Sequence, residues 1–298
     1  IAVTGVSGFT GSVIARQAHE AGHTVTALVR ETSRRDHVEP FVDRFVVGAQ
    51  DDESAWPALL EGADAVIHNS VDWGPLRAKD LPTHGQSNLL ASIRLLETSA
   101  PRPFTFMSTI AVHHDMRPHW KGVIDEDHPL RPNTEYGAYK AAVEAHLWTE
   151  HFSNKRQTAA IRPCAVYGID PNLPRSHGHP LIEKIRNGQK ITKPGGGKFV
   201  HVEDVAAATL ATLTNPDVAA GKPFNLVDCY ARWADWAQIT AELLGVEAEI
   251  DVSSPAQPRN QFLPDVGRRM GAGLDRGLDG IRAHLSELIP LMREAGEL

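Results

Sequence analysis

The chain has 298 residues, 42% hydrophobic and 22% charged, so it is long enough to bury the core of one large or two small domains. A net charge of −7 argues against a nucleic-acid-binding surface, and no apolar run approaches the ~20 residues of a membrane span. The two cysteines, Cys164 and Cys229, are too few for a disulfide framework and no signal peptide is recognisable, so we expect a cytoplasmic location.

The chain begins with an apolar strand, expected over residues 1–4, and continues with a loop that carries Gly5, Gly8 and Gly11 before a helix over 11–21. Glycines lack Cβ, so the backbone of such a loop can approach a pyrophosphate closely. The N–H groups and the positive dipole end of the following helix then bind the phosphates. The alternative is a tight strand–helix turn, but the strand before and the helix after favour dinucleotide binding.

Strands and helices alternate over the first half of the chain. We expect further strands at 24–29, 44–47, 63–68, 103–107 and 157–162, helices at 55–60, 84–99 and 136–152, and a loop at 111–134. This alternation predicts an α/β protein with a Rossmann-type, doubly wound parallel sheet.

After residue 165 proline and glycine become frequent and the expected elements become shorter. They are helices at 205–213 and 233–244, a strand at 223–227 and an extended loop at 251–262. We therefore predict a dinucleotide-binding domain over 1–165, to which about 199–230 returns, and a smaller, mostly substrate-binding portion over 166–298.

Tyr136 and Lys140 are expected on one face of a helix, because they are four residues apart. A neighbouring ammonium lowers the tyrosine pKa from about 10, which would let Tyr136 act as a proton donor or acceptor. The alternative is that Tyr136 packs and Lys140 is solvated. Upstream, Ser108 and Thr109 end a parallel strand, where a hydroxyl points toward the place at which ligands bind, or caps the strand end.

Together these segments resemble the extended, NAD-dependent epimerase/dehydratase-like branch of the short-chain dehydrogenase/reductase superfamily. The resemblance covers nearly the whole chain and also rests on residues 4–11 (T-G-x-x-G-F-x-G), 62–68, 162–168 (R-P-x-x-V-Y-G) and 199–205 (F-V-H-V-x-D-V). Thr109 matches the catalytic Ser/Thr of that branch, because it lies four residues before His113. His113 stands where that branch usually has the tyrosine of a V-Y-G motif.

The resemblance implies hydride transfer between nicotinamide C4 and a substrate carbon. In it, Tyr136 transfers the hydroxyl proton, Lys140 lowers the tyrosine pKa and holds the nicotinamide ribose, and Thr109 hydrogen-bonds the substrate oxygen. Asn88 would support the local helix or a water relay. The residues expected to contact the dinucleotide are Gly5, Ser7, Gly8, Phe9, Thr10, Gly11, Arg30, Arg34, Asp51, Asn69, Ser70, Asn88, Tyr136, Lys140, Pro163 and Val166.

The end of the second strand favours NADP over NAD, although NAD is possible. NAD-selective sites often place an acidic residue there, whereas an arginine suits a 2′-phosphate. Val29 takes the acidic position, and Arg30 and Arg34 follow it. The alternative is a solvated basic turn.

Differences from the family pattern indicate which class of substrate the protein binds. Ile110 and Ala111 stand where dehydratases carry Asp-Glu, and Ala165 stands where nucleotide-sugar epimerases often carry asparagine. We therefore expect an oxidoreductase acting on a carbonyl or secondary alcohol of a small, non-nucleotide substrate. A nucleotide-sugar epimerase is the alternative enzyme, and a non-catalytic NADP-sensing regulatory protein is the alternative of another class.

The sequence also leads to expectations about metal binding, the substrate cleft and the oligomeric state. The histidines at 113, 114, 119, 177 and 179 lack the carboxylate or cysteine companions of a typical metal site, so we expect no metal. Trp73, Trp120 and the 113–131 loop are expected to line the substrate cleft, and Cys164 to be a buried residue rather than a nucleophile. By resemblance, a homodimer would form through the helices at 84–99 and 136–152.

Overall fold

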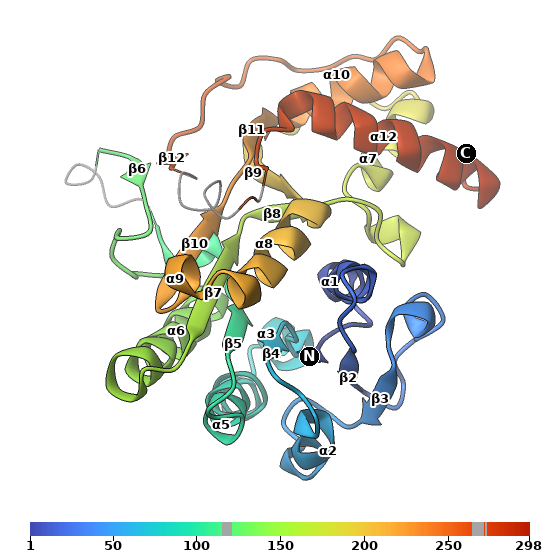
Figure 1. The fold of residues 1–298 in the computed structure, drawn as a ribbon. Coiled ribbons are helices and arrows are strands. Elements are labelled where there is room, and N and C mark those ends of the chain that lie inside the picture. The colour runs from blue at the N-terminus through green and yellow to red at the C-terminus, as the bar shows by residue number, and fades with distance from the viewer. Residues whose placement is uncertain (115–120, 264–270, 272) are drawn as a thin grey trace.

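The computed structural model describes residues 1–114, 121–263, 271 and 273–298. Its centre is a seven-stranded sheet with the order β10-β7-β5-β4-β1-β2-β3, in which all neighbouring strands are parallel (Figure 1). The strands are β1 (Ala2–Thr4), β2 (Thr26–Val29), β3 (Arg44–Val47), β4 (Val66–His68), β5 (Phe104–Met107), β7 (Thr158–Pro163) and β10 (Lys222–Leu226). The predicted Rossmann-type, doubly wound parallel sheet is confirmed.

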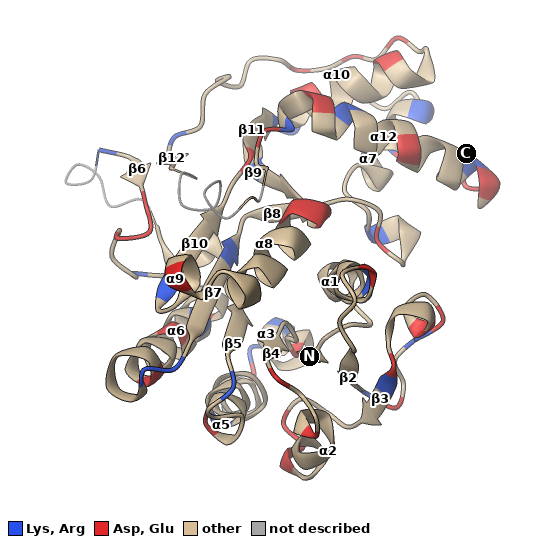
Figure 2. Cartoon of the chain, viewed as in Figure 1, with Lys and Arg blue, Asp and Glu red and all other residues tan. Residues whose placement is uncertain are grey.

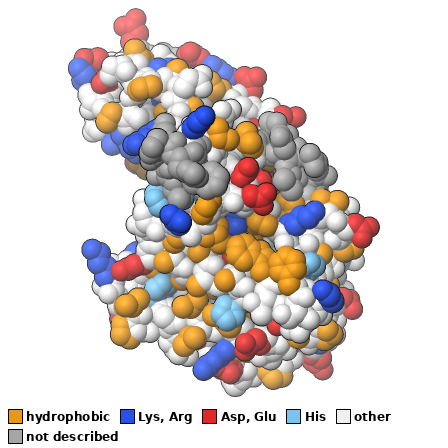
Figure 3. Space-filling model, turned by 90° about the vertical axis from the view of Figure 1, so that its left-hand side faces the viewer, with side chains coloured by type: hydrophobic (Ala, Val, Ile, Leu, Met, Phe, Trp, Pro, Cys, Tyr) orange, Lys and Arg blue, Asp and Glu red, His pale blue; other side chains and the backbone are white. Residues whose placement is uncertain are grey.

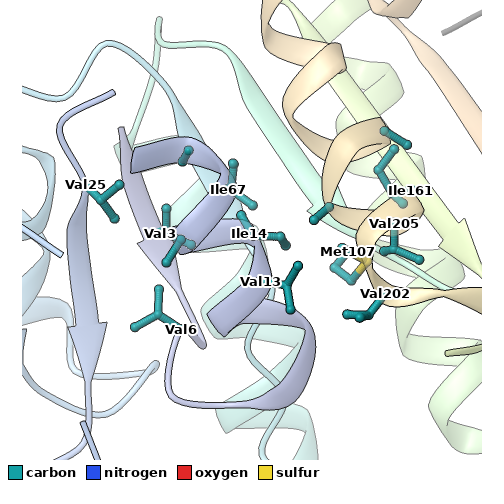
Figure 4. Packing of buried hydrophobic residues seen from close by; sticks show 14 of the residues in the cluster. Val3, Val6, Val13, Ile14, Val25, Ile67, Met107, Ile161, Val202 and Val205 are labelled. Carbon is teal, nitrogen blue, oxygen red and sulfur yellow. The ribbon is translucent and has the colours of Figure 1, made fainter. Parts of the chain in front are cut away.

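Helices cover both faces of this sheet. One face packs on α1 (Phe9–Glu20) and α8 (Val202–Thr214), through a core that includes Val3, Ile14 and Val205 (Figure 4). The other face packs on α2 (Trp56–Leu60), α5 (Ala91–Thr98) and α6 (Glu135–Asn154). The strands β1, β2, β4 and β5 are buried on both faces, which explains their nearly continuous apolar sequences.

Short elements connect these layers. They are α3 (Trp73–Ala78), α4 (Leu81–His84), α9 (Pro216–Ala219), the 3-10 turns η1 (Glu39–Phe41), η2 (Glu53–Ala55), η4 (Ile110–Val112) and η5 (Leu173–Arg175), and the π-helical turn η3 (Gly85–Leu90). The helix expected over 84–99 is therefore a sequence of α4, η3 and α5, and α3 was not expected. A π turn inserts one extra residue per turn, so the regular 3.6-residue period on which the expectation depended is interrupted there.

The C-terminal part builds a second, smaller layer. It holds a three-stranded sheet of β8 (Ala165–Tyr167), β9 (Gly196–His201) and β11 (Cys229–Arg232), with α7 (His179–Arg186), α10 (Trp233–Leu244) and α12 (Gly277–Glu294) around one apolar cluster. β6 (Val123–Ile124) and β12 (Gln261–Phe262) form a separate pair. The chain crosses between layers, because α8 and β10 lie with the large sheet while β9 and β11 lie in the small one.

The elements expected after residue 165 become shorter and include no helix near the C-terminus, whereas α12 has 18 residues. Gly277, Gly280 and Pro290 lower its helix propensity. Its buried residues nevertheless recur at helical spacing, and packing on α10 stabilises the helix.

Charged residues of both signs are spread over the outer helices and connecting segments (Figure 2).

Candidate active site

A cavity of about 580 Å³ lies at the carboxyl ends of the parallel strands. Residues that follow β1, β2, β4, β5 and β7 all contribute to its lining. This is the edge at which open α/β sheets bind ligands. Of the residues expected to contact a dinucleotide, the lining includes Gly5, Ser7, Gly8, Phe9, Thr10, Arg30, Asp51, Asn69, Ser70, Tyr136, Lys140, Pro163 and Val166.

The glycine-rich loop is shaped by close backbone contacts. Gly5 has a φ of +77°, which favours glycine, and a Cβ at Gly11 would lie 2.0 Å from the carbonyl oxygen of Gly5. Gly8 caps α1 without any side-chain hydrogen bond, so the first N–H groups of that helix remain available to an anion. A loop packed too tightly to accept side chains at Gly5 and Gly11, ending at an uncapped helix, fits the pyrophosphate of a dinucleotide.

The part of the cavity lining that follows β2 and β3 carries charged and polar groups. Arg30 is exposed and lines it, together with Asp51, whereas Val29 is buried. Arg34 is not part of the lining: it donates to the carbonyl oxygen of Pro171 at 2.8 Å and pairs with Asp36 at 3.0 Å. The lining also includes residues that the sequence analysis missed, namely Gln50, Ser33, Asp170 and Arg175.

Thr109, Tyr136 and Lys140 lie on one wall of the cavity. Thr109 follows β5, and its hydroxyl accepts a hydrogen bond from the Ala111 N–H at 3.2 Å. Tyr136 and Lys140 lie in the first two turns of α6, which Thr134 caps through the N–H of Gly137. The neighbouring Ser108 has a different partner, because its hydroxyl donates to the buried carboxylate of Glu144.

Lys140 is fully buried, and its Nζ donates to the carbonyl oxygen of Met107 at 2.5 Å. Burial lowers the pKa of Lys140 to about 7, against the opposing effect of Glu144. The ammonium lies 4.3 Å from the ring centroid of Phe106 and 5.8 Å from that of Tyr136. The structure therefore holds the lysine at the strand end rather than in solvent.

The expected lowering of the tyrosine pKa by Lys140 is not seen. Burial raises the pKa of Tyr136 to about 12, and the opposing influence is a hydrogen bond with Thr109. Desolvation disfavours the phenolate more strongly than the surroundings favour it. The tyrosine hydroxyl is therefore protonated at neutral pH, which suits donation of a proton.

Trp73 stacks on Tyr136, with ring centroids 5.0 Å apart and an interplanar angle of 28°. Trp73 begins α3 and also lines the cavity, as expected for a cleft residue. Trp120 and His119 lie outside the described residues.

Asn88 and Gly11 do not line the cavity, but both are next to it. Asn88 is buried in η3 and binds the backbone of Asp72 and the side chains of Gln50 and His84. This geometry fits local support of the structure. Cys164 lines the cavity, and burial raises the pKa of its thiol, which disfavours the nucleophilic thiolate.

Histidines that the sequence raised as possible metal ligands have protein partners. His113 Nε2 lies 3.1 Å from Nη1 of Arg162, His179 Nε2 lies 2.6 Å from a carboxylate oxygen of Glu297, and His177 packs on Phe199. Within the described ranges, no group of three or more His, Cys, Asp or Glu residues could hold a metal ion. Within the same ranges, no helix has the length and apolar character needed to cross a membrane.

Comparison with known proteins places the chain among dinucleotide-dependent enzymes. A sequence model of the NAD dependent epimerase/dehydratase family matches residues 1–226. The chain is 26% identical to a 3-diazoavenalumate denitrifying reductase of Streptomyces sp, over 87% of this chain and 86% of the relative. It is also 26% identical to a putative UDP-glucose 4-epimerase of Methanocaldococcus jannaschii, over 72% of this chain and 73% of the relative.

The fold is likewise similar to solved structures. The structure of MoeE5 in complex with UDP-glucose and NAD superposes with a TM-score of 0.77 at 22% identity, covering 98% of both chains.

Proposed function

The chain belongs to the NAD dependent epimerase/dehydratase family, and on that premise we propose that it is an oxidoreductase acting on a small carbonyl compound or secondary alcohol. Such an enzyme takes NADP(H) or NAD(H), of which we propose NADP(H) as the preferred cofactor. The bound nicotinamide would supply or accept the hydride at the substrate carbon. The protein's own residues would handle the proton and the orientation of the substrate.

The observation that supports this proposal most directly is that Thr109, Tyr136 and Lys140 lie together on one wall of the cavity, beside the glycine-rich loop. In the direction of reduction, Tyr136 would donate its hydroxyl proton to the substrate oxygen as the neighbouring carbon gains the hydride. Thr109 would donate a hydrogen bond to the same oxygen, and Lys140 would hold the nicotinamide ribose. Oxidation of the alcohol would reverse these transfers.

The preference for NADP(H) is supported by the lining at the end of β2. Arg30 extends into solvent at the cavity, and Val29, where an acidic residue would repel a 2′-phosphate, is apolar and buried. An arginine fork pairs well with phosphate. Asp51 would then lie near the adenine end of the cofactor.

A nucleotide-sugar epimerase is the second candidate, favoured by the similarity to a putative UDP-glucose 4-epimerase and to the UDP-glucose complex of MoeE5. Ala165, in place of an asparagine expected near a diphosphate, argues for the smaller substrate.

We further propose a homodimer through η3–α5 and α6, in the cytoplasm. Leu90 and Phe152 on these elements are 42% and 65% exposed. On the face that Figure 3 shows, exposed hydrophobic side chains gather near the middle. The free cysteines fit a reducing compartment.

The test is oxidation of NADPH by the purified protein with a panel of aldehydes, ketones and UDP-sugars, followed by mass spectrometry and chromatography of the products. Net loss of NADPH with a reduced product is expected. A sugar isomer formed without net loss of NADPH would replace the proposal with the epimerase.

A further inference from the structure

Trp73 and Tyr136 are shared between the dinucleotide cavity and a second cavity of about 380 Å³. The second cavity lies between α3 and the first turn of α6. Its lining residues are Trp73, Leu76, Arg77, Thr134, Glu135 and Tyr136. A molecule that extends from the dinucleotide cavity past Tyr136 into the second cavity would therefore contact the indole of Trp73.

The indole is held in a defined plane. It stacks on Tyr136 at a centroid distance of 5.0 Å, and the guanidinium carbon of Arg77 lies 5.9 Å from its ring centroid. Trp73 nevertheless remains 44% exposed, so part of its apolar surface is free to contact a ligand. Aromatic rings prefer such stacked contacts with other planar rings.

The charges around this cavity do not favour an ion of either sign. Arg77 contributes a positive charge from α3 and Glu135 a negative charge from α6. The apolar surface between them comes from Trp73, Leu76 and the ring of Tyr136. These surroundings fit an uncharged, flat body better than a phosphate or a carboxylate.

Resting on the proposed hydride-transfer function, we propose that Trp73 is a specificity-determining residue that selects an uncharged aromatic carbonyl compound, or the corresponding alcohol. The substrate ring packs against the exposed part of the indole, which Tyr136 does not cover, while its carbonyl oxygen accepts the hydrogen bond of Tyr136. A saturated ring of the same carbon number is thicker and lacks the π system, so it gains less from the same surface.

The test compares acetophenone with cyclohexyl methyl ketone, which has the same carbon skeleton but a saturated ring in place of the flat aromatic one. Their dissociation constants are measured by calorimetry on protein saturated with NADP⁺, which does not reduce a ketone. We expect about 2- to 10-fold tighter binding of acetophenone. Trp73→Ala should remove this preference, and Trp73→Phe should retain part of it.

Leu81→Ala is the matched control, because Leu81 is 64% exposed and lies outside both cavities. It should leave the preference unchanged. Equal binding of the two ketones by the unmodified protein, or an undiminished preference in folded Trp73→Ala, would overturn the inference. A change of oligomeric state in Trp73→Ala with an unchanged preference would instead assign Trp73 to a subunit interface.

Binding is measured here without turnover, so the two proposals fail separately. A clear preference for acetophenone in a protein that transfers no hydride to any carbonyl would overturn the proposed function alone. Reduction of aromatic and saturated ketones with no difference in affinity would overturn the role of Trp73 alone.

Discussion

The side-chain amide of Asn88 binds both backbone polar groups of Asp72. Its Oδ1 accepts the Asp72 N–H at 2.8 Å, and its Nδ2 donates to the Asp72 carbonyl oxygen at 2.9 Å. Asp72 in turn caps α3 through the N–H of Gly74 at 3.1 Å. The start of α3, and with it the indole of Trp73, is therefore fixed by a residue in the π turn.

Replacement of Asn88 by alanine should weaken ketone binding more than dinucleotide binding. The change leaves two backbone groups of Asp72 unsatisfied, at a cost of about 1–3 kcal/mol each when they stay buried. Trp73 then loses its fixed position. We expect a larger increase in the dissociation constant for acetophenone than for NADPH, and equal weakening of both would contradict this positioning role.

Removal of the Glu144 carboxylate should destabilise the fold strongly. Glu144 and Arg162 pair at 2.6 Å with both side chains fully buried. Breaking a buried pair leaves a charge without a partner, so Glu144→Ala should lower the free energy of unfolding by about 3–5 kcal/mol. The matched control is Glu61→Ala in the exposed pair with Arg44, where we expect less than about 1 kcal/mol.

Urea denaturation of the two variants supplies this comparison. Similar losses in Glu144→Ala and Glu61→Ala would contradict the importance of the buried pair.

His68 should make the protein less stable as the pH falls. Its ring lies between the hydroxyls of Thr4 and Ser92, and burial lowers its pKa to about 3. Between pH 6.5 and 3 the unfolded chain binds a proton that the folded chain does not, so stability is lost as pH decreases. For this one group the loss between pH 7 and pH 5 is about 2 kcal/mol.

The measurement is the free energy of unfolding at pH 7 and at pH 5, for the unmodified protein and for His68→Gln. The difference between the two pH values should be smaller in the variant by that amount. An identical pH dependence would show that folding does not lower the pKa of His68.

Local sequence patterns predicted much of the fold and the position of the cavity. The glycine-rich loop and the alternation of apolar strands and helices depend on neighbouring residues, so they are visible in the sequence. The stack of Trp73 on Tyr136 and the bonds between Asn88 and Asp72 join separate segments, and no local spacing indicates them. The same holds for Arg34, whose partner Pro171 lies 137 residues away.

The electrostatic expectation failed for a different reason. The spacing of Tyr136 and Lys140 correctly predicts one helix face, but it contains no information about burial. Desolvation decides the pKa of both groups in the structure and raises that of the tyrosine. Only the packed core supplies that effect.

Arg30→Ala should weaken NADPH binding much more than NADH binding. A charge-assisted hydrogen bond to the 2′-phosphate contributes about 1.5–3 kcal/mol, which corresponds to roughly 10- to 100-fold in affinity. Arg34→Ala is the control, because Arg34 binds Pro171 and Asp36 outside the cavity lining. Fluorescence titration with both cofactors measures the ratio, and an equal loss for NADPH and NADH would reject Arg30 as the phosphate ligand.

Tyr136→Phe should nearly abolish turnover and leave the dissociation constant of NADPH almost unchanged. The variant keeps the ring that stacks on Trp73 but removes the proton donor, whose contribution as a general acid is about 10²- to 10⁴-fold in rate. The neighbouring Tyr139→Phe provides the matched control, since Tyr139 is buried outside the cavity lining and should retain activity. Stopped-flow measurement of NADPH oxidation distinguishes the two. Because only Tyr136 has its hydroxyl at the wall shared with Thr109, equal loss of rate in both variants would indicate disturbed packing of α6 rather than a missing proton.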